Sequence, residues 1–177
     1  AEENRQVSPF HLAARVLQEQ GQGTSPLISG TYPGYEGYYN YFNVGASGST
    51  NEQVIINGLN YAKNNNWKGT YYSILGGAEV ISANYIRKGQ DTLYLQKFNV
   101  SPTASNPIYT HQYMQNISAP TTEALSIKKL YESAGALENT FVFKIPVYEN
   151  IPASPCPMPT SSTNVVLQVP SGYDAAA

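Results

Sequence analysis

Glu19 is the carboxylic acid with the most favourable surroundings for chemistry in this sequence, because it follows an apolar helical pattern and precedes a run of small residues. Ser8 and Pro9 predict the start of a helix, and Gly21 predicts its end. Glu19 then lies in the last helical turn, where the negative end of the helix dipole and burial both favour the protonated acid. A side chain that keeps its proton at neutral pH can serve as a general acid.

The simpler interpretation of Glu19 is a solvated residue at a helix end, which is the usual case for an arbitrary glutamate. The residues that follow favour the chemical interpretation. Gly21 and Gly23, with Thr24 and Ser25 behind them, let the backbone leave the helix sharply and keep bulky side chains away from the carboxyl group. A long polymer can therefore reach this acid through an open groove.

The composition of the chain favours a neutral, polar ligand. Its 177 residues suffice for one domain, its formal net charge is −2, and only 12% of its residues are charged. Its 10 Lys and Arg residues form no basic run, which argues against nucleic acid or an anionic membrane as the partner. The 15 tyrosines and many neutral amides and hydroxyls suit an uncharged glycan. Alternatively the tyrosines fill the core, which we accept for about half of them.

Cysteine and histidine are too rare for a metal site or a disulfide framework. Cys156 is the single cysteine, and His11 and His111 are the two histidines. They supply no recognisable zinc ligand set, so we expect no metal and no other cofactor. The sequence contains no segment suited to membrane insertion, and residues 1–4 do not resemble a signal peptide, so we expect a processed or excised domain.

Four helices are predicted from their start signals, their end signals or their small residues. A capping box is matched by residues 49–52, and Thr121 or Thr122 caps the last helix. Gly76 and Gly77 permit close packing of the third helix against a neighbour. The first helix is expected over residues 9–20, and the second begins at the capping box and frays at residues 64–66. The third is expected over about 71–88, and the last from its threonine cap to about residue 134.

The remaining segments are less regular. Residues 25–48 are expected to hold a short β-hairpin or an irregular lobe, and residues 92–98 fit a strand or a helical turn equally well. Residues 109–116 predict a short helix, whereas residues 141–147 look extended. The Pro-rich residues 152–159 predict a linker or a strap.

These elements predict a mainly α fold of the α+β class, with a small β or loop lobe. We expect a catalytic domain over residues 1–149 and a Pro-rich extended tail over residues 150–177.

Four motifs occur in an order that resembles a known family. Residues 19–25 read Glu-Gln-Gly-Gln-Gly-Thr-Ser, and residues 40–46 read Asn-Tyr-Phe-Asn-Val-Gly-Ala. Residues 85–94 read Tyr-Ile-Arg-Lys-Gly-Gln-Asp-Thr-Leu-Tyr, and residues 111–113 read His-Gln-Tyr. Over roughly residues 9–148 the chain resembles the glucosaminidase domain of bacterial autolysins, the endo-β-N-acetylglucosaminidases of glycoside hydrolase family 73.

This resemblance implies a lysozyme-like fold that cleaves peptidoglycan on the reducing side of N-acetylglucosamine, with Glu19 as the general acid. It also implies a secreted protein of the cell wall, expected to be a monomeric domain of a larger wall protein whose partner is the glycan strand. The residues that the resemblance assigns to the groove are Asn40, Phe42, Tyr85, Gln112 and Tyr113.

One position departs from the family pattern and leaves the second catalytic group open. Asn116 stands where the family has an aspartate, so a carboxylate is missing. Hydrolysis of a glycoside needs a base, an enzymic nucleophile or the substrate's acetamido oxygen besides the acid. Glu36 is the best candidate base, unless it is an ordinary exposed loop residue. In the substrate-assisted alternative, Tyr113 and Asn116 orient the acetamido group and a water.

Several interpretations stay open at this point. His111 can polarise a neighbour in the groove, but we favour a structural hydrogen-bonding role. Tyr35, Tyr38 and Tyr39 fit a sugar-stacking platform or simple loop packing. A muramidase or lytic transglycosylase on the same fold, a glycan-binding module without activity, and a structural wall or coat protein are the alternative functions.

Overall fold

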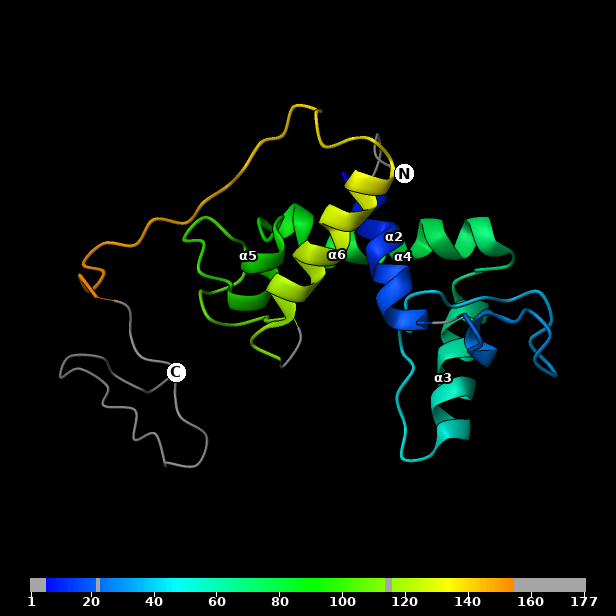
Figure 1. Cartoon of the computed structure of the whole chain (residues 1–177). Coiled ribbons are helices and arrows are strands. Elements are labelled where there is room, and N and C mark those ends of the chain that lie inside the picture. The colour runs from blue at the N-terminus through cyan, green and yellow to red at the C-terminus, as the bar shows by residue number, and fades with distance from the viewer. Residues whose placement is uncertain (1–5, 22, 114–115, 155–177) are drawn as a thin grey trace. The chain divides into compact units, whose positions relative to one another are not determined.

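The computed structural model describes residues 6–21, 23–113 and 116–154, and the chain divides into two units, Ala1–Phe141 and Val142–Ala177. The first unit is mainly helical, which confirms the predicted class (Figure 1). Within the described residues its β structure is limited to one isolated bridge, between Tyr38 and Lys68. The helices are α2 (Pro9–Gln20), η1 (Pro26–Ile28), α3 (Asn51–Asn64), α4 (Thr70–Asn84), η2 (Ile86–Lys88), α5 (Leu93–Phe98) and α6 (Ala119–Ser133).

Helix α2 has the predicted bounds. Pro9 occupies the first helical turn, and Gly21 ends the helix with a φ of 51° and an N–H that donates to the carbonyl of Leu17. Ser8 precedes the helix, but its hydroxyl does not cap an amide and lies 3.4 Å from the hydroxyl of Tyr131 in α6.

The capping box of α3 lies one residue further along than the sequence suggested. The hydroxyl of Thr50 accepts from the amide of Gln53, and Oε1 of Gln53 accepts from the amide of Ser49. Thr50 is therefore the N-cap, and the Gln53 side chain reaches back to Ser49, one residue before the cap, instead of to Thr50 itself.

Helix α4 ends at Asn84, four residues before the predicted end. Tyr85 leaves the helical conformation with a φ of −126°, and the chain continues as η2 to Gly89, whose φ is 84°. Close packing through the small residues is confirmed. A Cβ atom at Gly77 would overlap the ring of Phe42, and one at Gly76 would overlap the ring of Trp67.

The structure decides one open alternative and corrects one prediction between α4 and α6. The ambiguous residues 92–98 form helix α5, because the hydroxyl of Thr92 caps the amide of Leu95. The short helix predicted over residues 109–116 is absent from its described part. Tyr109 and His111 have φ angles of 65° and 49°, which a right-handed helix does not allow.

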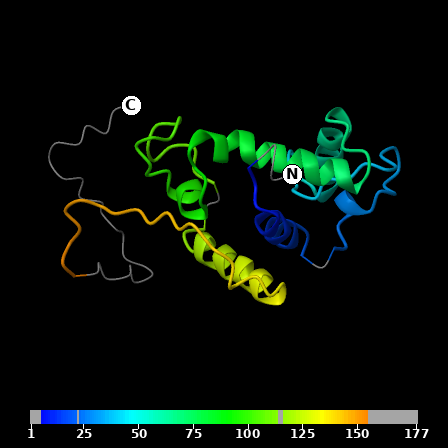
Figure 2. The same ribbon diagram turned by 90° about the horizontal axis from the view of Figure 1, so that it is seen from above.

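Helix α6 begins at Ala119, before either threonine that was expected to cap it, because Pro120 suits the first helical turn. The α6 helix packs along α2 (Figure 2). The buried core joins α2 to α4 through Leu12, Phe42, Ala78 and Ile81, and it also includes Val7.

Residues 25–48 form an irregular lobe rather than a hairpin. Its centre is Asn40, which is fully buried. The Asn40 amide group donates to the carbonyls of Val44 and Gly58 at 2.8 Å each and accepts from the amide of Val44 at 3.1 Å. One side chain thereby replaces the hydrogen bonds that a sheet would supply.

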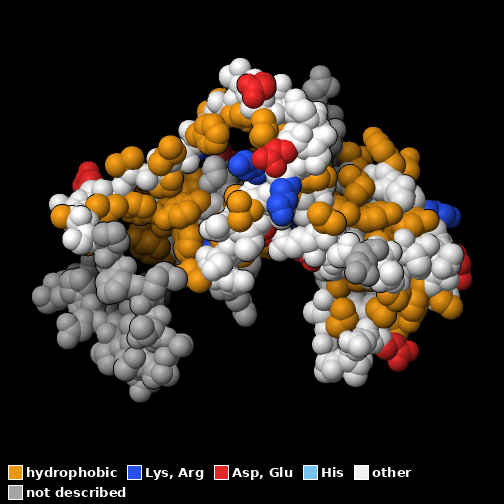
Figure 3. All heavy atoms as spheres, viewed as in Figure 1, with side chains coloured by type: hydrophobic (Ala, Val, Ile, Leu, Met, Phe, Trp, Pro, Cys, Tyr) orange, Lys and Arg blue, Asp and Glu red, His pale blue; other side chains and the backbone are white. Residues whose placement is uncertain are grey.

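The second unit is described over residues 142–154, which carry no strand or helix. The division after Phe141 differs from the expected boundary at 149, which stays a prediction. Cys156 and most of the Pro-rich segment lie outside the described residues. Figure 3 shows that charged groups are sparse on the face viewed there, as the composition predicts. No described helix combines the length and apolar character needed to cross a bilayer.

Candidate active site

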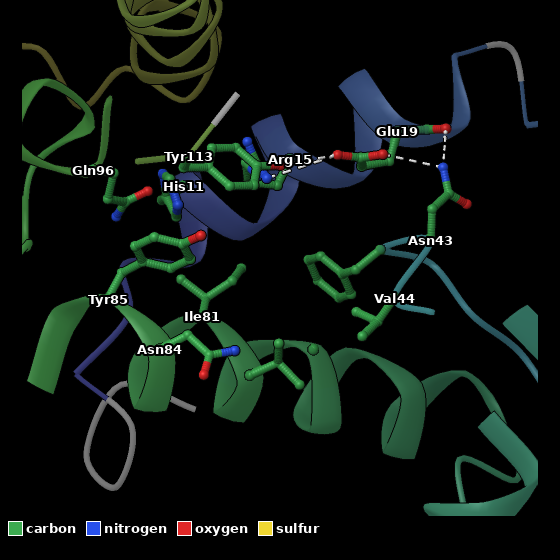
Figure 4. A pocket seen from close by; sticks show the side chains of 13 residues that line it. His11, Arg15, Glu19, Asn43, Val44, Ile81, Asn84, Tyr85, Gln96 and Tyr113 are labelled. Carbon is green, nitrogen blue, oxygen red and sulfur yellow. Dashed lines mark hydrogen bonds and ion pairs between the residues drawn. The ribbon is translucent and has the colours of Figure 1, made fainter. Parts of the chain in front are cut away.

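A cavity of about 310 Å³ lies between α2, α4 and the loop at residues 42–44 (Figure 4). His11, Arg15 and Glu19 line it from one face of α2, since they are spaced four residues apart. The other lining residues are Phe42, Asn43, Val44, Gly77, Val80, Ile81, Asn84, Tyr85, Gln96 and Tyr113. The lining combines apolar side chains with polar and charged ones, so the cavity suits a ligand that has both apolar and hydrogen-bonding surfaces.

The Glu19 carboxyl group lies in the wall of this cavity and retains 23% of its side-chain exposure. The Tyr113 hydroxyl donates to Oε1 at 3.3 Å, and Nδ2 of Asn43 donates to Oε2 at 3.1 Å. One amino group of Arg15 lies 3.7 Å from Oε1. The carboxyl group is therefore held in one orientation while remaining accessible from the cavity.

Asn43 is a site residue that the sequence did not single out. Gln20, which is buried, donates from Nε2 to Oδ1 of Asn43 and to the carbonyl of Tyr41 at 2.9 Å each. Because the oxygen of Asn43 is thus occupied, its amino group is left to face Glu19, where it also binds the Glu19 carbonyl at 3.0 Å. The signal was weak, since Asn43 is one polar residue within a motif.

Arg15 is the second missed residue, although its position four residues before Glu19 is a recognisable helical pairing. Its buried guanidinium forms an ion pair with Glu123 of α6 at 3.0 Å. The same guanidinium lies 4.1 Å from the centre of the Tyr113 ring. Arg15 therefore connects α2 to α6 and supports the ring whose hydroxyl contacts Glu19.

The cavity contains three of the residues that the resemblance assigned to the groove. Phe42 is buried against α4, and the rings of Tyr85 and Tyr113 meet edge to face with centres 5.5 Å apart. Burial raises the pKa of the Tyr85 phenol, and the positive charge of Arg15 opposes this rise. Tyr85 is therefore a neutral hydrogen-bonding group at physiological pH.

Three other predicted groove residues lie outside this cavity. Asn40 is enclosed in the lobe, with its amide group taken up by the backbone. Gln112 is exposed and donates to the carbonyl of Phe98 at 3.2 Å. Asn116 is exposed, and its side-chain oxygen accepts from the amide of Ser118 before α6. Each is occupied with backbone groups, which the sequence pattern did not reveal.

Glu36, the candidate base, lies on an exposed loop and does not line the cavity. Its carboxylate accepts from the amide of Gly34 at 3.0 Å. Hydrogen bonds from backbone amides lower the pKa of Glu36, and nearby Lys63 adds to this. Glu36 is therefore an ionised carboxylate exposed to water.

His111 and the tyrosines of the lobe make contacts of a structural kind. Nδ1 of His111 lies 3.0 Å from Oε1 of Gln90, a fully buried residue. The Tyr35 hydroxyl donates to Asn60 of α3 at 2.7 Å, and the ring of Tyr39 stacks on that of Tyr41. Within the described residues no group of three or more His, Cys, Asp or Glu side chains is arranged to hold a metal ion.

The sequence and the fold of the chain resemble those of known proteins. No family model matches the chain. The bifunctional autolysin of Staphylococcus epidermidis is 32% identical over 152 residues, which are 81% of this chain and 11% of that protein. The chain thus spans about a tenth of its curated relative.

Two crystal structures of S. aureus autolysin E resemble the fold, each with a TM-score of 0.57 over 76% of this chain and 57% of the other. One, 29% identical, is a catalytic mutant with glutamate replaced by alanine, in complex with the disaccharide NAG-NAM. The other, 30% identical, is bound to the muropeptide NAM-L-Ala-D-iGlu. With this helical, lysozyme-like fold and these sequence relatives, the chain belongs to the family of bacterial autolysin glucosaminidase domains.

Proposed function

We propose that this domain hydrolyses the glycan strands of peptidoglycan, cleaving the β-1,4 bond after N-acetylglucosamine with Glu19 as the general acid. The observation that carries the proposal is the Glu19 carboxyl group in the cavity wall, contacted by Tyr113 and Asn43. The disaccharide NAG-NAM bound to the mutant of autolysin E supports the choice of substrate.

In the proposed reaction, Glu19 transfers its proton to the glycosidic oxygen as the bond to the anomeric carbon breaks. Asn43 fixes one carboxyl oxygen, and the hydroxyl of Tyr113 contacts the other. Phe42 and Tyr85 offer apolar surfaces against which the C–H faces of a sugar ring can pack.

For the second half of the reaction we favour the substrate's own acetamido oxygen over a second carboxylate. In this mechanism the acetamido group attacks the anomeric carbon, and water then opens the cyclic intermediate. The support is the contrast between Glu36, which is bound to its own loop, and Tyr113, whose hydroxyl lies beside Glu19. We assign to Tyr113 the role of orienting the acetamido group.

A digestion experiment tests the proposed bond. Purified peptidoglycan is digested with the domain, and the new reducing ends are reduced with borohydride and identified. N-acetylglucosaminitol is the expected product, whereas muramitol would indicate a muramidase. Glycan binding without any new reducing ends would instead indicate a binding module. Glu19→Gln serves as the inactive control.

We further propose that the protein acts outside the cell at the wall, as a domain of a longer chain. The support is its similarity to one part of a bifunctional autolysin. The sparse charge suits contact with a polymer of neutral sugars rather than with nucleic acid.

A further inference from the structure

Arg15 occupies an unusual position, because one buried guanidinium contacts two carboxyl groups of different character. Its Nη1 atom lies 3.0 Å from Oε1 of Glu123, which is buried on α6. Its Nη2 atom lies 3.7 Å from Oε1 of Glu19, which faces the cavity. Figure 4 shows this guanidinium beside the Tyr113 ring, with a dashed line to Glu19.

Such a cation poses a problem for a general acid. A positive charge within about 4–6 Å of a carboxyl group stabilises the ionised form and shifts its titration by roughly 1–3 pH units. Alone, Arg15 would therefore draw the proton from Glu19 and leave a carboxylate that cannot donate.

Glu123 supplies the opposing charge. It is 4% exposed, and Arg15 is the only hydrogen-bonding partner that its carboxylate has within the described residues. Glu123 lies closer to the guanidinium than Glu19 does and is more deeply buried. Its electrostatic attraction to Arg15 is therefore the stronger of the two. Seen from Glu19, the Arg15–Glu123 pair is then nearly neutral.

The other groups that face Glu19 do not replace this balance. His11, on the same face of α2, is neutral, because burial and then the charge of Arg15 lower its pKa to about 4. Tyr113 and Asn43 donate hydrogen bonds to the Glu19 carboxyl group but bring no formal charge. Tyr85, after α4, is a neutral phenol. Arg15 and Glu123 are therefore the charges that matter at this site.

We propose that Glu123 is a positioning residue that offsets the positive charge of Arg15 beside Glu19, and that proton donation by Glu19 depends on this balance. Through the same contact Glu123 holds the guanidinium under the ring of Tyr113. This inference rests on the proposed function, in which Glu19 is the acid. Helix α6 then influences the acid through Glu123, which is 108 residues from Arg15 along the chain.

The test is Glu123→Gln, which removes the charge but keeps the size and an oxygen that can accept from Arg15. Glu132→Gln is the matched control, because it removes the same charge from the same helix at an exposed pair with Lys128. Two quantities are measured: the pH profile of kcat, and the titration of the Glu19 carboxyl carbon by NMR.

In Glu123→Gln, the alkaline limb of kcat and the Glu19 titration should both move to lower pH by about one unit. Above that limb the rate should fall roughly tenfold, with little change on the acidic side. Glu132→Gln should match the wild type in both quantities. Unmoved profiles in Glu123→Gln would overturn the inference.

The two readouts separate this inference from the proposed function. A wild-type domain without turnover contradicts the proposed function, while the NMR titration still tests the charge balance. If Glu123→Gln does not fold, the double variant Arg15→Met, Glu123→Leu removes both charges and keeps the contact apolar. Its Glu19 titration should stay at or above that of the wild type, and a fall to lower pH would overturn the inference.

Discussion

Two regions of the first unit carry the polar residues that the sequence offered for chemistry, and they differ in what surrounds those residues. The cavity face of α2 presents Glu19 among side chains that hold its carboxyl group from several directions. The exposed loops carry Glu36, Gln112 and Asn116, and each of these is bound to a nearby backbone group. The difference teaches that a motif residue contributes to the site only where packing limits its contact with water and its side chain is not already hydrogen-bonded to nearby backbone groups.

The largest test of this comparison replaces the two carboxyl groups separately. We expect Glu19→Gln to lower kcat by roughly 10²–10⁴-fold, because it removes the proton donor. Glu36→Gln should leave kcat within about twofold, because surface changes of this kind are mild. Reducing-end release at matched protein concentration measures both. A large loss in Glu36→Gln would restore Glu36 as the base.

The buried His11 on the cavity face of α2 predicts that the stability of the domain depends on pH. The folded-state pKa of His11 is lowered to about 4 from an ordinary value of 6.5, so the unfolded chain binds the proton first as the pH falls. Stability should therefore decline as the pH drops from about 6.5 towards 4, by roughly 3 kcal/mol in all from this residue. Urea denaturation at several pH values measures the decline.

His11→Gln provides the control for this pH dependence, because it removes the titrating group and keeps a polar side chain. The slope of unfolding free energy between pH 6.5 and 4 should become shallower in this variant. An unchanged slope would assign the pH dependence to other groups.

Two asparagines test whether burial separates scaffold from surface. Asn40→Ala should destabilise the domain by roughly 2–3 kcal/mol, because the backbone groups of Val44 and Gly58 lose the hydrogen bonds that the buried Asn40 supplies. Asn116→Ala should cost about 0.5 kcal/mol, since its side chain is exposed. Thermal unfolding followed by circular dichroism ranks the two, and equal losses would contradict the contrast.

The smallest expected effect concerns a single hydroxyl group. Tyr113→Phe keeps the ring over Arg15 but removes the donor to Glu19, so kcat should fall roughly tenfold with little change in stability. Tyr35→Phe removes a comparable hydroxyl from the lobe, where it binds Asn60, and should leave kcat unchanged. A wild-type rate in Tyr113→Phe would exclude this hydroxyl from the reaction.

Local signals predicted most helices, and two of the failures share one cause. Pro9 and Gly21 bound α2 correctly because both act through their own backbone geometry. The end of α4 and the segment around His111 were wrong, because Tyr85 and His111 pack against each other across the chain. Such a contact overrides local propensity and leaves no periodic signal.

The candidate site divides in the same way. The sequence indicated Glu19, Phe42, Tyr85 and Tyr113, and the structure brings these four to one cavity, although their catalytic roles stay proposals. It did not indicate Glu123, because no pattern within a helix reports a partner 108 residues away.

The sequence by itself determined the mainly helical class, the position of Glu19 in the last turn of α2, and the low charge of the surface. These follow from local backbone preferences and composition. Only the tertiary structure decided that Arg15 lies between Glu19 and Glu123, and that Asn40 serves the scaffold rather than the cavity. The physical reason is that burial and charge pairing depend on side chains from distant segments, which meet only when the chain is folded.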